Sequence, residues 1–174
     1  MIRIYGSYEE AESDILESMR NSESVKILVQ MGRKEFLGEQ FSFLYEALKG
    51  LKAKKISVAF ASKDSPYFSE ERSKGLGKHP NEFRMLLGQL SERMSLLTYE
   101  CEKNQNKITL IPHKEPFLFK LFLFDDDGFI MFYTYPKDND LRASWFRVKN
   151  EEGSLYQMAN DYYSDLEARY GVRE

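Results

Sequence analysis

The chain has 174 residues, of which 42% are hydrophobic and 30% charged, and its formal net charge is −3. This length and composition predict one globular domain over residues 1–174, and without a basic excess we expect neither nucleic acid nor a membrane as a partner. The single cysteine, Cys101, excludes an internal disulfide, and no leader or apolar run of about 18 residues is present, so we expect a cytoplasmic protein.

The first half of the chain alternates predicted helices and strands. Ser7 begins a helix through a capping box with the glutamate three residues later. Residues 25–31 and 55–61 each contain a run of at least three consecutive apolar residues, which is typical of strands covered on both faces. A helix is predicted between them, from residue 34 to about residue 48. Because a helix connects the two strands, we expect them to be parallel.

The second half adds consecutive strands and a covering helix. Asp127-Gly128 is typical of a tight hairpin turn and predicts an antiparallel pair. In the last helix we expect Leu155, Met158, Tyr162 and Leu166 to face inward. The predicted elements are a helix from Pro80 to about Glu102, strands over 107–111 (ended by Pro112), 117–124, 129–135 and 143–149, and a helix that begins after Gly153-Ser154 and ends at Gly171. Together these elements predict an α/β fold with a mixed sheet and helices on both faces.

One lysine interrupts the most apolar stretch of the chain, Pro116–Pro136. Lys120 lies in a strand that is apolar at both parities, and a lysine is rarely buried without a partner. It either opens onto a cavity or pairs with a carboxylate. For an open cavity we expect Lys120→Met to be neutral or stabilising; for an internal pair we expect it to destabilise. The sequence favours the first outcome.

Lys120 and Asp125 have the spacing of the lysine and aspartate in the HxKxxxxD signature of the phospholipase D-like superfamily. The order of elements from Ser7 to Gly171 also resembles one half of that family, and is similar to phospholipase D-like domains of bacterial regulatory proteins that have lost the full signature. Leu118 stands at the position of the nucleophilic histidine, and Phe132-Tyr133 replaces the glycine and serine that usually follow. The resemblance therefore implies the family's fold without its covalent chemistry, which needs a nucleophile.

His113 is the histidine nearest in the sequence to Leu118, which stands at the position of the family's nucleophile. It precedes Leu118 by five residues, so in a continuous strand it would lie on the opposite face about 17 Å away. Pro112 and Pro116 flank it and favour a loop. We therefore expect His113 not to replace the missing nucleophile.

The candidate ligand-binding residues follow from two considerations. Open α/β sheets bind ligands beyond the carboxyl ends of their strands, which selects the loops after the first two long strands. Aromatic residues and arginine on the late strands could line a pocket or a dimer face, or form a core cluster. The candidates are Lys120, Arg33, Lys34, Ser62, Tyr133 and Arg147. Asp125, Asp126 and Asp127 fit turn chemistry better than a metal site, so no metal or cofactor is predicted.

Three functions remain open on this basis. The leading one is a non-catalytic sensor or regulatory domain that binds an anionic, phosphate-containing small molecule. The second is a divergent phosphodiesterase or nuclease with His113 or His79 as the base. The third is an interaction domain, because the resemblance to one half of a two-half site implies a homodimer or docking within a longer parent protein, with two Lys120 strands near one shared cleft.

Overall fold

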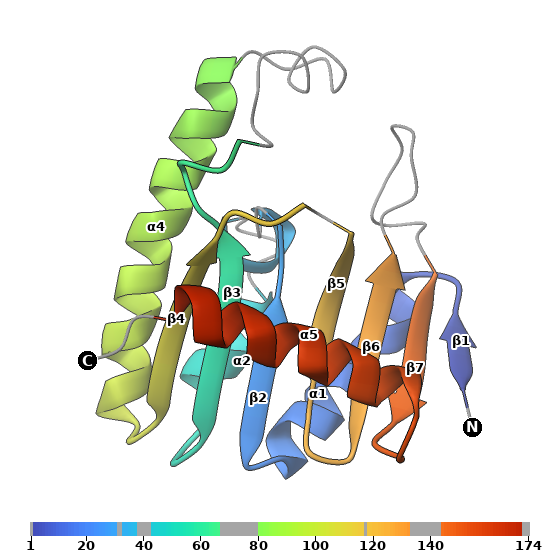
Figure 1. Cartoon of the computed structure of the whole chain (residues 1–174). Helices are drawn as coiled ribbons and strands as arrows, with labels where there is room; N and C mark the ends of the chain where they lie inside the picture. The colour runs from blue at the N-terminus through green and yellow to red at the C-terminus, as the bar shows by residue number, and fades with distance from the viewer. Residues whose placement is uncertain are drawn as a thin grey trace.

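The computed structural model describes residues 2–30, 33–37, 43–66, 80–116, 118–132 and 144–171, with their side chains except those of Arg33, Lys34, Phe43, Pro80 and Phe83. A seven-stranded mixed sheet carries helices on both faces, which confirms the predicted α/β class (Figure 1). No helix in the described ranges is long and apolar enough to cross a membrane. In chain order the elements are β1 (Arg3–Tyr5), α1 (Tyr8–Asn21), β2 (Ser24–Leu28), the π-helical segment η1 (Arg33–Leu37), α2 (Phe43–Lys49), β3 (Lys55–Ala61), α4 (Pro80–Lys103), β4 (Lys107–His113), β5 (Phe119–Leu123), β6 (Asp127–Phe132), β7 (Trp145–Lys149) and α5 (Leu155–Tyr170).

The strand order is β1-β7-β6-β5-β2-β3-β4. β2, β3 and β4 run parallel, which confirms the prediction for the two long early strands. β5 is antiparallel to both β2 and β6, and β7 and β1 continue the antiparallel half. β2 therefore lies where the parallel and antiparallel halves meet, and its carboxyl end is beside the beginning of β5.

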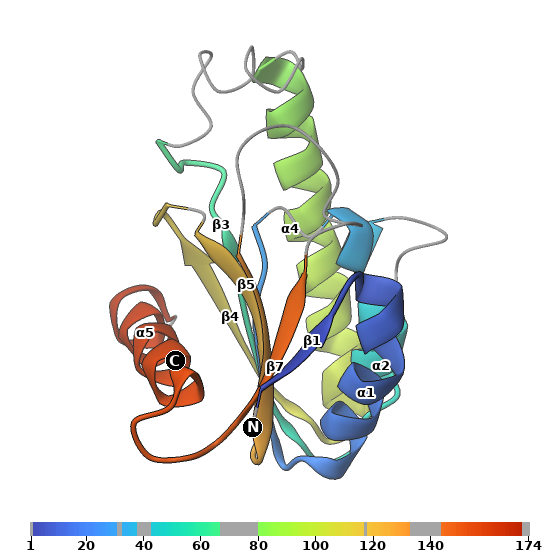
Figure 2. The same ribbon diagram turned by 90° about the vertical axis from the view of Figure 1, so that its right-hand side faces the viewer.

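Figure 2 shows α1, α2 and α4 on one face of the sheet and α5 on the other. Consecutive residues of β5 alternate between the two layers: Phe122 packs in the core under α1 and α4, whereas Leu121 and Leu123 pack under α5. All three are buried. This two-sided burial is why the strand is apolar at both parities.

The hairpin between β5 and β6 turns earlier than the Asp-Gly pair predicts. Leu123 pairs with Gly128, and the Phe124 N–H donates to the Asp127 carbonyl at 2.8 Å, so Asp125 and Asp126 form the turn. Asp127 is instead a buried residue of β6, 2% exposed. The prediction placed the turn two residues too late because Asp127 is held by cations of the neighbouring strand, which outweighs its local turn preference.

Two helix predictions and the predicted end of the strand over 107–111 also need correction. The helix expected over residues 34–48 is described as two pieces, η1 and α2, and residues 38–42 lie outside the described part. In α5 the inward residues are Tyr156, Ala159, Tyr163 and Leu166, whereas Met158 is 67% exposed. β4 continues through Pro112 to His113. Pro112 is tolerated because β4 is the edge strand of the sheet.

Candidate functional site

Lys120 lies near the beginning of β5, beside the carboxyl end of β2, on the face covered by α1. Its ammonium contacts the Glu35 carboxylate at 2.5 Å, and the two residues are 4% and 5% exposed. Glu35 belongs to η1, which follows β2 in the chain. The structure therefore realises the second of the two arrangements expected for Lys120, a buried pair with an acid.

A half-buried tyrosine lies near this pair. The phenol of Tyr8, on α1, is buried, and burial together with the charges of Glu12 and Glu35 raises its pKa above the ordinary tyrosine value. Tyr8 therefore stays neutral beside the ion pair. Because Glu35 already neutralises Lys120, an incoming phosphate would have to compete with a carboxylate that is part of the fold.

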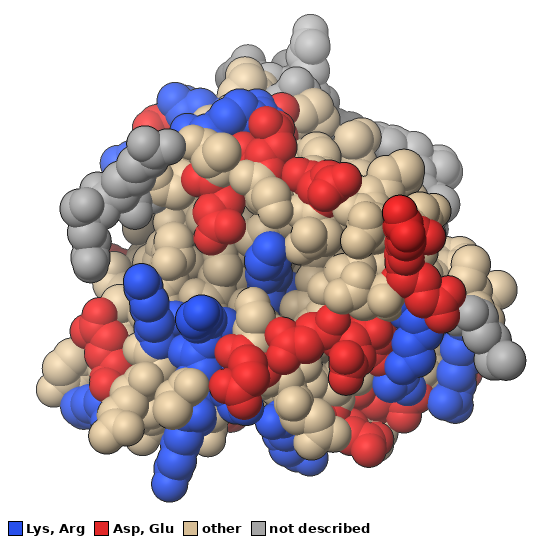
Figure 3. All heavy atoms as spheres, turned by 60° about the horizontal axis from the view of Figure 1, so that its bottom comes forward, with Lys and Arg blue, Asp and Glu red and all other residues tan. Residues whose placement is uncertain are grey.

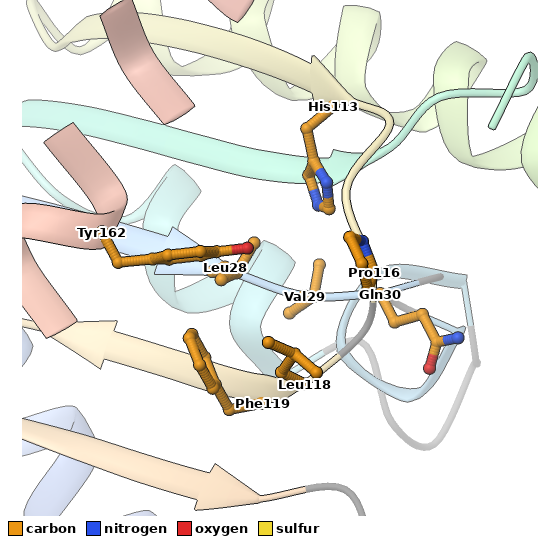
Figure 4. Close-up of a pocket in the computed structure, with 8 residues that line it drawn as sticks. All are labelled: Leu28, Val29, Gln30, His113, Pro116, Leu118, Phe119 and Tyr162. Carbon is orange, nitrogen blue, oxygen red and sulfur yellow. The ribbon is translucent and has the colours of Figure 1, made fainter. Parts of the chain in front are cut away.

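Leu118 and His113 line one small cavity at the carboxyl ends of the central strands (Figure 4). His113 reaches it from the end of β4 and Tyr162 from α5, while Leu118 and Phe119 come from the beginning of β5. The separation of about 17 Å applies only to a continuous strand, and the two residues do not share one. β4 ends at His113 and β5 begins at Phe119, so the chain crosses the ends of β3 and β2 between them; the loop favoured by the flanking prolines begins after His113, which is itself the last residue of β4.

The chemistry of His113 is set by its burial. It is 2% exposed, and burial lowers its pKa to about 4. Its Nδ1 accepts a hydrogen bond from the Glu115 N–H at 3.2 Å. Glu115 is anchored to α5 by Tyr170 and Arg169, with contacts of 2.6 and 2.5 Å. His113 is thus a fixed, neutral imidazole and a weak base at neutral pH.

The cavity itself is small. It has about 10 Å³ of space for a water-sized molecule, near the minimum needed to hold one water. The other lining residues are Leu28, Val29, Gln30 and Pro116. This space is comparable to one water molecule and is too small for a phosphodiester.

Arg147 lies on β7 and takes part in a different cluster, between α1 and the antiparallel half of the sheet. Its guanidinium contacts Asp127 at 2.5 Å, Asp14 at 3.3 Å and Ser18 at 3.3 Å. Asp14 and Ser18 are both on α1. These bonds attach α1 to β6 and β7, so Arg147 has structural partners for its charge.

The remaining candidate residues are placed only in part. Ser62 follows β3, where its N–H donates to the His113 carbonyl at 2.8 Å and its Oγ accepts from the Asp64 N–H at 3.3 Å. Arg33 and Lys34 begin η1, but their side chains lie outside the described part, as do Tyr133 and His79. The segment after β3 therefore lies at the same end of the strands as His113.

The acidic turn connects distant backbone. Asp125 accepts hydrogen bonds from the N–H groups of Glu23 and Ser24, at 2.6 and 3.1 Å. The predicted contact to backbone amides is present, but the amides belong to the beginning of β2 and not to the turn. Among the described residues no group of three or more His, Cys, Asp or Glu side chains is arranged to hold a metal ion.

The lysines between the end of α2 and the beginning of β3 (Lys49, Lys52, Lys54 and Lys55) lie among acidic residues. Lys49 pairs with Glu46 at 3.2 Å and Lys54 with Glu23 at 3.3 Å. Figure 3 shows blue and red side chains adjoining one another on this end of the molecule. The positive charges of Lys49 and Lys54 are therefore balanced by neighbouring carboxylates.

Sequence reasoning missed Glu35. The only available signal was indirect: a lysine in an apolar strand requires an acid, but any of the 28 Asp and Glu residues could supply it. The pairing of β5 with β2 identifies the partner, because it brings the segment after β2 close to Lys120.

No protein-family model and no curated protein matches the chain. Solved structures do resemble it. TrmBL2, an archaeal chromatin protein, has a TM-score of 0.54 at 6% identity over 97% of this chain and 52% of its own. NucT from Helicobacter pylori has a TM-score of 0.51 at 13% identity, and the match covers 100% of this chain and 99% of that one. Phosphatidylserine synthase from Haemophilus influenzae has a TM-score of 0.54 at 14% identity, covering 98% and 38%.

These likenesses define the class of fold. NucT and the phosphatidylserine synthase have phospholipase D-superfamily folds, so the present chain has a phospholipase D-like α/β fold. It spans about half the length of TrmBL2 and just over a third of the synthase. At 6–14% identity, the likeness extends to the fold and not to the activity.

Proposed function

We propose that this chain is a non-catalytic phospholipase D-like domain that acts as a sensor or regulatory module. The observation that carries the proposal is Leu118, an aliphatic residue at the position where the family signature has its nucleophile. Covalent phosphoryl transfer needs an activated nucleophilic atom there.

The surroundings of Leu118 support the same conclusion. The nearest histidine, His113, is buried with its pKa lowered to about 4. A general base is most effective when its pKa is near the working pH. Lys120 is neutralised by Glu35, and the adjacent cavity has space for about one water molecule.

The resemblance to TrmBL2 favours a regulatory role, because that protein is described as chromatin-associated and DNA-binding. We propose that the anionic ligand binds at the carboxyl ends of β2 and β3. Arg33 and Lys34 follow the first of these strands and Ser62 the second. Lys120 would contribute only after Glu35 is displaced.

Thermal-shift titration with inorganic phosphate, nucleotides and model phosphodiesters tests the binding proposal. We expect a saturable rise in Tm with at least one of these anions, and a smaller rise in a variant carrying Arg33→Ala and Lys34→Ala. The matched control is Lys52→Ala, an exposed cation at the opposite end of the sheet. No rise with any probe would refute the anion-sensing role.

The second candidate is a divergent phosphodiesterase, and one observation favours it: His113 and Leu118 line the same cavity. Incubation of the pure protein with bis(p-nitrophenyl) phosphate, with and without divalent metals, separates the two functions. We expect no turnover. Hydrolysis that is lost in His113→Ala and retained in His79→Ala would reverse the assignment.

We also propose that the domain functions with a second half, either another copy or part of a longer chain. The support is that the chain matches 99% of NucT but only 38% of the longer synthase. Sedimentation equilibrium at micromolar concentration decides the self-association, and a strict monomer would leave only the longer chain.

A further inference from the structure

β4 is the edge strand of the parallel half of the sheet, and its backbone groups alternate between β3 and the outside. The Lys107 N–H donates to the Lys54 carbonyl, and the Ser62 N–H donates to the His113 carbonyl, both at 2.8 Å. In a parallel ladder every second residue bonds to the same neighbour. Residues 107, 109, 111 and 113 therefore face β3, and Ile108, Leu110 and Pro112 point their backbone outward.

This alternation explains the proline inside the strand. Pro112 has no N–H, and it falls at an outward position where β3 requires none. The outer edge consequently offers the N–H and C=O groups of Ile108 and Leu110 and the carbonyl of Pro112. No strand among the described residues pairs with this edge. The stretch from Ile108 to Pro112 also carries no charged side chain, and charges are a common protection of exposed edges.

An open groove of about 820 Å³ runs beside the edge. Its walls are Ile108 and Leu110 of β4 on one side and Thr98 and Glu102 of α4 on the other. In Figure 1 α4 extends past β4 at this end of the sheet, and Figure 2 places it on the α1 side. The helix α4 thus covers, on one face, the position beside β4 that an additional strand would occupy.

The position of α4 also limits what can bind in the groove. Two copies of β4 could pair symmetrically only as antiparallel strands about an axis perpendicular to the sheet. That axis would keep both α4 helices on one face at the junction, where each already projects beyond its own edge strand (Figure 1). A single extended peptide has no such obstacle.

We propose that the groove between β4 and α4 binds an extended peptide segment of a partner protein, which joins the sheet as an additional strand. Its main chain would bond to Ile108, Leu110 and Pro112, as in other cases of strand addition. This surface is separate from the cavity of His113 and Leu118, and the inference does not depend on the proposed sensing of an anion.

The groove also specifies the chemistry of the peptide. Ile108 and Leu110 are partly buried and pack against the core under α4, with Thr98 facing them. Peptide side chains that point toward α4 should therefore be β-branched, Val, Ile or Thr, at every second position. Lys55 and Lys107 are an exposed cross-strand pair at the beginning of β3 and β4 on the side away from α4, whereas Glu102 lines the α4 side, so an acidic residue at that end of the peptide should point away from α4.

The experiment selects peptides from a random twelve-residue display library against the wild-type protein, and measures binding of the recovered peptides by fluorescence anisotropy. Leu110→Pro removes one outward N–H and adds a ring at the docking edge, while the bonds to β3 are unchanged. Leu110→Ala is the matched control because it also loses the leucine side chain but keeps the N–H. We expect at least tenfold weaker binding to Leu110→Pro than to Leu110→Ala, with similar Tm values for the two variants.

Amide hydrogen exchange in the wild-type protein tests the same edge without a substitution. The recovered peptide should slow exchange at Ile108 and Leu110 at least tenfold, whereas Thr109 and Ile111 are already protected by β3. Recovery of no peptide, equal binding to the proline and alanine variants, or unchanged exchange at Ile108 and Leu110 would each overturn the proposal.

Discussion

Replacing Lys120 by methionine removes one partner of a fully buried ion pair. The methionine fills most of the lysine's volume, so packing changes little, but the Glu35 carboxylate remains in a site where it is 5% exposed. Breaking a buried pair from one side costs about 3–5 kcal/mol. For a domain of this size each kcal/mol corresponds to about 2–4 °C in Tm, so we expect a fall of roughly 6–20 °C.

This expectation is opposite in sign to the one that the sequence favours. An unpaired lysine in an apolar strand would make methionine neutral or stabilising, whereas the observed contact of 2.5 Å with Glu35 makes it destabilising. The pairing, which the sequence left open, decides the sign.

Urea unfolding of four proteins measures the effect as a double-mutant cycle: wild type, Lys120→Met, Glu35→Leu, and both changes together. We expect each single change to destabilise and the double variant to recover most of the loss, because a well-packed apolar pair can replace a buried ion pair at little cost. A Lys120→Met protein as stable as the wild type would refute the reasoning, and so would additive losses in the double variant.

Three further outcomes are expected. The folded-state pKa of His113, about 4 against an ordinary 6.5, lies below the unfolded value, so its contribution to stability is present above pH 6.5 and is lost as pH falls toward 4. That contribution is roughly 3 kcal/mol, and His113→Gln should flatten this part of the urea-midpoint profile; an unchanged profile would contradict it. Asp127→Asn should cost about 2–3 kcal/mol in urea unfolding by weakening the charge-assisted bond to Arg147, and a loss below measurement would contradict the α1 attachment. Gly128→Ala should cost about 1–3 kcal/mol, because its new Cβ would lie 2.7 Å from Leu123 Cδ2; an unchanged midpoint would show that Leu123 moves freely.

The central strands were predictable because they are rich in apolar residues and bounded by turn residues. Residues 55–61 are apolar except for Lys55 and Ser57, and they form β3 with the predicted bounds, Lys55–Ala61. The inward face of α5 was less predictable. Tyr156, Ala159 and Tyr163 are buried in place of Met158, because tyrosines can bury their rings while their hydroxyls bond to buried backbone or side chains. Hydrophobicity alone therefore predicts the helix, but it places most of the inward-facing positions one residue too early.

The candidate site was predictable only as far as local sequence reaches. The position of Leu118 can be read from the motif spacing, and the suspicion about Lys120 follows from its apolar neighbours. Two long-range facts could not be read in this way: the contact of Lys120 with Glu35, 85 residues earlier, and the approach of His113 to Leu118. Both depend on how β5 inserts beside β2, which no local pattern encodes.

The position of β5 beside β2 also has a consequence for synthesis of the protein. β2 is complete at Leu28, but its neighbour on one side, Phe119–Leu123, follows only after about 90 further residues. At ribosomal rates of about 5–20 residues per second, this delay is roughly 5–20 s. During that interval β3 can join β2 on one side, while the other side, with Ile27 and Leu28, has no strand to pair with. The strand that lies at the centre of the finished sheet therefore has an unpaired edge in the nascent chain. Such an edge is prone to aggregation, and ribosome-associated chaperones would bind it at this stage.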